Sequence, residues 1–198
     1  MANPTSLTLS DRLFPAERLN PIARGAILAI IGSLLLVISA KISVPFWPVP
    51  MTMQTGVVLL IGAAYGWRLG VATVLLYLAQ GAMGLPVFTG TPEKGIGIVY
   101  MMGTTGGFLL GFILMAAVAG WFAERGVTKS IVKTGAVMFI AGFIVYVPGL
   151  LWLGSLLGWD KPILEWGFYP FVAGDLTKIA LATVIAVAAD KGLSKLRR

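Results

Sequence analysis

Long apolar runs that carry almost no charge constrain this chain more than any other feature. The run from Ile22 to Ala40 is 19 residues long and contains a single charged side chain, Arg24, close to one end. A helix of about 20 apolar residues crosses the hydrocarbon core of a bilayer, which is roughly 30 Å thick. Charged residues make up only 12% of the 198 residues, about half the share in an ordinary soluble domain. The sequence therefore predicts a polytopic membrane protein and argues against a soluble monomer.

Six apolar segments, separated by turns or by charged connections, are the predicted transmembrane helices. Gly66, Arg68 and Gly70 divide the second long run, because glycines favour a turn between helices. We predict an all-α integral membrane protein with a single domain, residues 1–198, which begins with a polar cytosolic tail over residues 1–20. The predicted helices cover residues 22–40, 53–66, 69–84, 104–123, 132–157 and 171–190.

The basic residues gather on one side of this predicted topology. The opposite side carries only Lys41, Lys94 and Lys161, and Lys178 falls inside the last helix. Because cytoplasmic connections are enriched in Lys and Arg, we expect both termini in the cytoplasm and the bundle in the cell membrane. The net charge of +7 then has a topological explanation and requires no nucleic-acid partner. An even number of spans puts both termini on the basic side, with Arg12, Arg18, Arg24, Arg68, Arg125, Lys129, Lys133, Lys191, Lys195, Arg197 and Arg198.

Two residue types that carry much of enzyme chemistry are missing from the chain. It contains no Cys and no His, which removes thiol catalysis, disulfides and the commonest transition-metal ligand. It also lacks the G-x-x-x-x-G-K-[ST] phosphate loop, so energy from ATP would have to come through a partner. We therefore expect no enzymatic activity, no metal site and no cofactor.

The connections on the outer side are rich in proline and aromatic residues. The first of them has three prolines within six residues, Pro45, Pro48 and Pro50, next to Thr52, Gln54 and Thr55. A restrained backbone with large apolar rings and a few polar groups is typical of a small-molecule pocket. We interpret this first connection as a binding wall. The aromatic residues of the connection from 159 to 170 fit instead the interfacial belt found in membrane proteins generally.

Two charged residues lie inside the otherwise apolar last helix. A charge at the middle of a membrane costs about 2.5–3.5 kcal/mol on insertion scales, so Asp175 and Lys178 need a specific role. Their spacing of three puts both on one helix face, roughly 8 and 12 Å inward of Pro170. In this outer half of the membrane, the pair could hold the polar end of an amphipathic solute while aromatic residues cover its apolar part. The alternative is an ion pair that only locks this helix against its neighbours.

Small residues recur at helical spacing in two of the predicted helices. Gly25, Ala29 and Ser33 lie four residues apart in the first helix. Such a ladder lets another helix approach closely, either within the monomer or from another membrane protein, and the spacing alone does not distinguish the two. The glycines from Gly103 to Gly111 predict close packing of the fourth helix.

Five short motifs follow one another along the chain. They are VPMTMQT at 49–55, GWRLG at 66–70, GLPVF at 84–88, GTTGGFLLGF at 103–112 and GDLTK at 174–178. In this order they resemble the BioY family, the biotin-specific substrate-capture (S) components of energy-coupling-factor (ECF) vitamin transporters. The resemblance extends over all six predicted helices. Thr104 departs from the family pattern, which usually has proline there, without the loss of a polar group.

The resemblance implies the fold, the ligand and the partners of the chain. It implies a prokaryotic membrane subunit with an ECF S-component-like bundle, which captures biotin from outside with high affinity and delivers it inward. It also implies a transmembrane coupling subunit, docked on the first helix through Gly25, Ala29 and Ser33, and two ATPase subunits that supply the energy. The residues that it assigns to biotin binding are Asp175 and Lys178, with Thr52, Gln54, Phe88 and Tyr100 as the wall of the site. To these we add Trp47, because it belongs to the first outer connection.

Several alternatives to this interpretation stay open. The chain could be a solitary biotin transporter that needs no ATPase partner, or an S component for a related vitamin. An intramembrane enzyme that uses Asp175 as an acid or base is disfavoured, because such chemistry needs a second positioned group. A purely structural subunit, in which Asp175 and Lys178 only pair with each other, should keep ligand binding when both are replaced, by Asn and Met.

Overall fold

The structure, a computed structural model, describes residues 8–13 and 20–196. Most of the predicted tail, including Arg18, lies outside the described residues, and so do Arg197 and Arg198. Within the part described, five helical segments are long and apolar enough to cross a membrane. The second is bent into two arms that correspond to the predicted helices 53–66 and 69–84. The predicted all-helical membrane bundle is thus confirmed.

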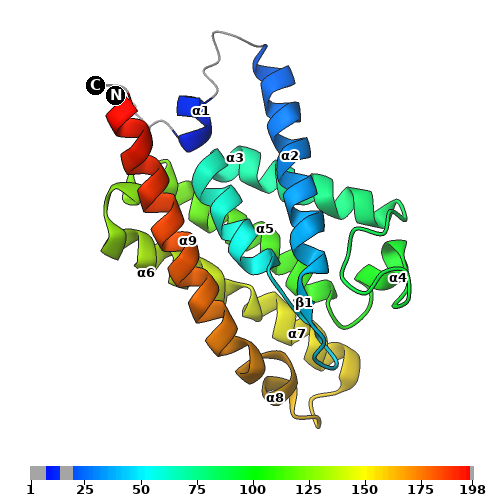
Figure 1. Cartoon of the computed structure of the whole chain (residues 1–198). Coiled ribbons are helices and arrows are strands. Elements are labelled where there is room, and N and C mark those ends of the chain that lie inside the picture. Colours follow the sequence, from blue (N-terminus) through cyan, green and yellow to red (C-terminus); the bar gives the residue numbers. More distant parts are fainter. Residues whose placement is uncertain (1–7, 14–19, 197–198) are drawn as a thin grey trace.

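The elements follow one another as helices joined by short connections (Figure 1). The start of α2 and the end of α9 lie at the same end of the bundle, and the hairpin of β1 and β2 lies near the opposite end. The bounds are α1 Leu9–Leu13, α2 Pro21–Lys41, β1 Ser43–Val44, β2 Met51–Thr52, α3 Gln54–Ala82, α4 Gly97–Met101, α5 Gly106–Ala123, η2 Val127–Lys129, α6 Ile131–Ile144, α7 Tyr146–Leu157, α8 Ile163–Gly167 and α9 Tyr169–Leu196.

The bend in α3 is at Gly66, where φ is 78° and ψ is 175°. An L-residue rarely adopts this backbone conformation, whereas glycine does so at little cost. The backbone N–H of Trp67, just after the bend, donates to Oε1 of Glu124 at 3.1 Å. The two arms of α3 pack together there, with Gly70 against Gly62. The bend therefore depends on glycine and is tied to the end of α5.

A second break divides the predicted helix 132–157 into α6 and α7 at Val145. Pro148 explains this break, because proline has no N–H to donate to the carbonyl of Ile144, four residues earlier. Proline is well tolerated in the first turn of a helix, which is where α7 places it. The consequence for the site is that Tyr146 becomes the first residue of α7.

The proline-rich first connection forms a hairpin, which the sequence did not predict. Strands β1 and β2 pair antiparallel, with Ser43 opposite Thr52. The Oγ1 of Thr104 donates to the carbonyl of Pro48 at 2.9 Å, which attaches the hairpin tip to the segment before α5. The ring of Phe46 packs edge-on against that of Phe171, near the start of α9. The hairpin thus covers the ends of α5 and α9.

Part of the predicted tail packs on the bundle as α1. Leu9 and Ser10 are buried there, and α1 contacts α3 and α9. Asp11 accepts from Nη2 of Arg24, in the first turn of α2, at 3.0 Å. Residues 8–13 are therefore part of the folded structure.

Candidate binding site

A pocket lies between the hairpin, the start of α3, the first half of α5, the α6–α7 break at Val145 and the start of α9. About 570 Å³ of empty space lies between its walls, a volume that includes the solvent at its open mouth. Its walls come from the segments 49–55, 88–89, 100–112, 145–146 and 171–178. The lining residues are Val49, Pro50, Met51, Thr52, Gln54, Thr55, Phe88, Thr89, Tyr100, Thr105, Phe108, Leu109, Phe112, Val145, Tyr146, Phe171, Asp175 and Lys178.

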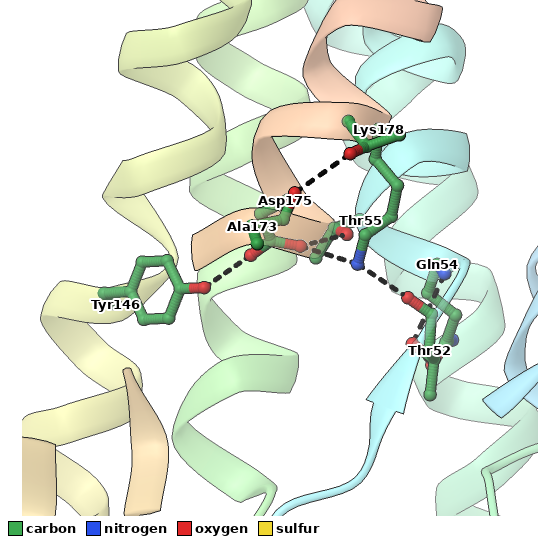
Figure 2. A network of polar contacts seen from close by, with 8 residues as sticks. Thr52, Gln54, Thr55, Tyr146, Ala173, Asp175 and Lys178 are labelled. Carbon is green, nitrogen blue, oxygen red and sulfur yellow. Dashed lines mark hydrogen bonds and ion pairs between the residues drawn. The ribbon is translucent and has the colours of Figure 1, made fainter. Parts of the chain in front are cut away.

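Asp175 is the most heavily hydrogen-bonded side chain of the pocket. It lies six residues into α9 and is only 4% exposed. Its Oδ1 accepts from Oγ1 of Thr55 at 3.1 Å and lies 2.6 Å from Nζ of Lys178. Its Oδ2 accepts from the hydroxyl of Tyr146. Figure 2 shows these side chains converging from α3, α7 and α9.

Lys178 connects this cluster to the hairpin. It is 6% exposed, and its Nζ donates to the backbone carbonyl of Thr52, in β2, at 2.9 Å. The stem of the side chain lies along Gly56 in the first arm of α3, where a methyl group would already be in contact with it. The ammonium group is therefore held between a carboxylate and a carbonyl at the edge of the pocket.

The close pairing explains how two charges are tolerated at this depth. An isolated buried charge is strongly disfavoured, whereas a pair that also satisfies its remaining hydrogen bonds is not. Asp175 has three partners and Lys178 has two. At about 1.5 Å per residue, the two lie roughly 9 and 14 Å along α9 from its first residue, Tyr169. The site thus presents both a donor and an acceptor well below the end of the bundle.

A second group of polar atoms comes from the start of α3. Gln54 is buried and its Nε2 donates to the hydroxyl of Tyr77 at 2.8 Å. Its Oε1 accepts from Oγ1 of Thr52 at 3.3 Å. Gln54 and Thr52 both line the pocket, whereas Tyr77 lies behind them. These atoms add further hydrogen-bonding groups to the pocket.

Aromatic rings form the apolar wall. Phe88 stacks on Tyr100 with ring centroids 4.8 Å apart and planes 12° from parallel. The backbone carbonyl of Phe88 accepts from Nζ of Lys41, at the end of α2, at 2.8 Å. Burial raises the pKa of the Tyr100 phenol above its ordinary value, so this hydroxyl stays protonated at neutral pH. The wall is therefore uncharged, and the hydrogen bond from Lys41 fixes the backbone of Phe88.

Most of the predicted binding residues come together in this pocket, and one does not. The structure places Trp47 at the tip of the hairpin, 73% exposed, with its ring edge-on to Trp166 at 5.1 Å. It is not a lining residue. The predicted residues that do line the pocket are Asp175, Lys178, Thr52, Gln54, Phe88 and Tyr100.

The small-residue ladder of α2, which we expected to form a docking surface for a partner, faces α3 instead. Ala29 and Ser33 are buried within the bundle. The Oγ of Ser33 accepts from Nε2 of Gln80, in the second arm of α3, at 3.3 Å. Gly25 faces Leu69 of the same arm. The ladder therefore packs inside the monomer, and large side chains such as those of Ile30 and Leu34 form the exposed face of α2.

Sequence reasoning missed one partner of Asp175 and gave too little weight to another. Tyr146 lies within a long apolar run, where nothing in the spacing marks it. The available signal was Pro148, since a proline inside such a run predicts a break nearby. Thr55 lies next to the residues that we predicted from the first connection but was not among the predicted binding residues.

In the described residues, no three Asp or Glu side chains gather as metal ligands would.

Comparisons with known proteins agree on one family. The model of the BioY family matches residues 9–195. A biotin transporter BioY from Thermotoga maritima is 38% identical over 169 residues, which cover 85% of this chain and 96% of that protein. A probable biotin transporter BioY from Pyrococcus horikoshii is 34% identical over 149 residues, 75% of this chain and 85% of that protein.

One solved structure has the same fold. It is the crystal structure of the S-component for biotin from an ECF-type ABC transporter, with a TM-score of 0.73. The match covers 87% of this chain and 93% of that one, at 24% sequence identity. The helices of this chain are therefore arranged as in that S-component.

Proposed function

The chain belongs to the BioY family, and from this premise we propose that it binds biotin in the pocket around Asp175 and Lys178. In this proposal the chain is the substrate-capture component of an ECF-type transporter, a multi-pass membrane protein that takes up biotin and catalyses no reaction. The observation that carries the proposal is the buried pair itself, with its Nζ and Oδ1 atoms 2.6 Å apart in a pocket with an aromatic wall.

The chemistry of biotin matches the groups in the pocket. Its ureido ring both donates and accepts hydrogen bonds, and its carboxylate requires a cation or hydroxyl groups. Its thiolane ring and valeryl chain are apolar. The pocket offers an ammonium group, a carboxylate, hydroxyl groups and an amide, beside the stacked rings of Phe88 and Tyr100. A ligand with polar ends and an apolar middle is the kind that this distribution favours.

The binding proposal is tested by calorimetry on the purified protein in detergent. We expect saturable biotin binding near one molecule per chain, and no binding of thiamine or riboflavin at the same concentrations. Replacing Asp175 and Lys178 together, by Asn and Met, separates binding from a purely structural role. A folded double variant with unchanged biotin affinity would show that the pair only locks α9.

Energy and partners form the second part of the proposal. We propose that a transmembrane coupling subunit and two ATPase subunits act with this chain. What supports this is the fold of an S-component, together with the absence of a phosphate loop from the sequence. The exposed apolar face of α2, which includes Ile30 and Leu34, is the part of that helix that such a subunit could reach.

A solitary biotin carrier is the rival to this second part. The test is uptake of labelled biotin by cells that lack their own transporter and express this chain with or without the ATPases. We expect uptake against a gradient only when the ATPases are present. Equal uptake in both strains would favour the solitary carrier and would leave the binding proposal intact.

A further inference from the structure

Tyr77 lies behind the pocket and joins two parts of its wall. It belongs to the second arm of α3, is fully buried and is not a lining residue. Its hydroxyl accepts from Nε2 of Gln54 at 2.8 Å and donates to the backbone carbonyl of Val87 at 3.3 Å. Its ring packs edge-on against Phe88, with centroids 5.4 Å apart.

We infer that Tyr77 is a positioning residue that sets the orientation of the Gln54 amide, so that the pocket presents a hydrogen-bond acceptor. The hydroxyl of Tyr77 has a single proton, and a backbone carbonyl can only accept. Since that proton goes to Val87, the hydroxyl oxygen is left to accept from Gln54. The NH₂ group of Gln54 must then face Tyr77, and its Oε1 must face the other way.

The contacts on the other side of Gln54 agree with this orientation. The Oγ1 of Thr52 accepts from the backbone N–H of Gln54 and donates to its Oε1, both at 3.3 Å. If the amide were turned over, the hydroxyl of Tyr77 would donate to Gln54 and the carbonyl of Val87 would lose its donor. A buried carbonyl without a donor is penalised, and Val87 is buried. One orientation therefore satisfies every group.

This orientation has a consequence for the choice of ligand. On the ligand side, Gln54 presents Oε1, which is an acceptor, in the same part of the pocket as Oγ1 of Thr52. The site should therefore select a ligand that donates an N–H there. The inference rests on the proposed function, because an N–H of the biotin ureido ring is such a donor. Tyr77 would set this selectivity without contact with the ligand.

Tyr77→Phe tests the inference, because it removes the hydroxyl and keeps the ring against Phe88. The measurement is the affinity for biotin and for two analogues in which one or the other ureido N–H is replaced by an ether oxygen. The wild type should bind biotin at least about tenfold more tightly than one of these analogues, the effect of one buried hydrogen bond. In Tyr77→Phe we expect about tenfold weaker biotin binding and a clear fall in this ratio, because the amide is free to turn.

The ratio of affinities separates positioning from a merely structural role. If the affinities for biotin and for the analogues fell together with the ratio unchanged, or if biotin affinity did not change, the inference would be overturned. The matched control is Tyr65→Phe in the first arm of α3, whose hydroxyl makes no hydrogen bond to the described residues. It should leave the affinities and their ratio unchanged.

A second variant covers the case in which Tyr77→Phe does not fold. Gln54→Met removes the acceptor and keeps Tyr77, so it should also abolish the preference for an N–H donor. If Gln54→Met preferred biotin over the analogues as strongly as the wild type does, the inference would be overturned. If the wild type did not bind biotin, both the proposed function and this inference would be overturned. If the wild type bound biotin but the variants kept its affinities and their ratio, the inference alone would be overturned.

Discussion

The Nζ of Lys178 lies 2.6 Å from Oδ1 of Asp175, one turn earlier on α9, and 2.9 Å from the carbonyl of Thr52 in β2. The same carboxylate accepts from Thr55 in α3 and from Tyr146 in α7. One ion pair therefore holds four elements of the bundle together at the pocket. A ligand that exchanges hydrogen bonds with this pair acts on all four elements at once.

Asp175→Asn should weaken biotin binding by about 1–3 kcal/mol, the cost of leaving a buried hydrogen-bonding partner unmet. The amide keeps the shape of the carboxylate but removes the charge that pairs with Lys178. Calorimetry in detergent measures the change. Asp160→Asn is the control, since Asp160 pairs with Lys161 in an exposed connection. Unchanged affinity in folded Asp175→Asn would exclude Asp175 as a binding residue.

Tyr146→Phe removes only the hydroxyl that donates to Asp175. A hydrogen bond to a charged group contributes about 1.5–3 kcal/mol, so biotin affinity or thermal stability should fall by an amount in that range. Thermal unfolding in detergent, with and without biotin, distinguishes the two effects. Tyr169→Phe serves as the control because Tyr169 is exposed at the start of α9. If Tyr146→Phe matched the wild type in both measurements, the hydroxyl would have no role in holding Asp175.

The features that the sequence could predict are those that the lipid environment requires of each segment by itself, namely a helical backbone and few charges. A run such as Ile22 to Ala40 must be helical to satisfy its backbone in lipid, and α2 covers residues 21–41. Asp175 and Lys178 stood out because charges are costly inside such a helix. Their depth and shared face followed from helix geometry alone, and the structure places them together.

The features that could not be predicted depend on how the helices pack. The ladder of Gly25, Ala29 and Ser33 allows close approach on either side, and only the bundle shows that α3 occupies that side. Tyr146 becomes a partner of Asp175 because Pro148 ends α6 early and turns the start of α7 toward α9. Trp47 looked like part of the wall because the first connection was treated as one surface, whereas its hairpin directs that ring outward.

Gly81→Ala should disturb the aromatic wall of the pocket. A methyl group at Gly81 would overlap the ring of Phe88, which is fully packed between Tyr77 and Tyr100. Overpacking of this kind costs about 1–3 kcal/mol, and we expect weaker biotin binding together with lower thermal stability. Gly192→Ala, near the end of α9, is the control because a methyl group there meets no other atom within 4 Å. Equal biotin affinity in the two variants would mean that the position of Phe88 does not matter for binding.

Gly66→Ala should destabilise the bundle and leave the affinity of the folded protein for biotin unchanged. At a φ of 78° and a ψ of 175° an L-residue is strained, at a cost of about 1–3 kcal/mol, and the added methyl group would also meet Oε1 of Glu124. The bend lies 12 residues along α3 from the pocket residue Gln54, so the effect on binding should be small. Thermal unfolding and calorimetry of the same sample separate the two.

Gly135→Ala in α6 is the matched control for this last variant. A methyl group at Gly135 meets only Thr183, at 3.7 Å, and alanine inside a helix is favoured over glycine by about 0.5–1 kcal/mol. Gly135→Ala should therefore unfold at the same temperature as the wild type or slightly higher, while Gly66→Ala unfolds lower. If Gly66→Ala were as stable as the wild type, the bend would not depend on glycine, and α3 would have to accommodate its two arms in another way.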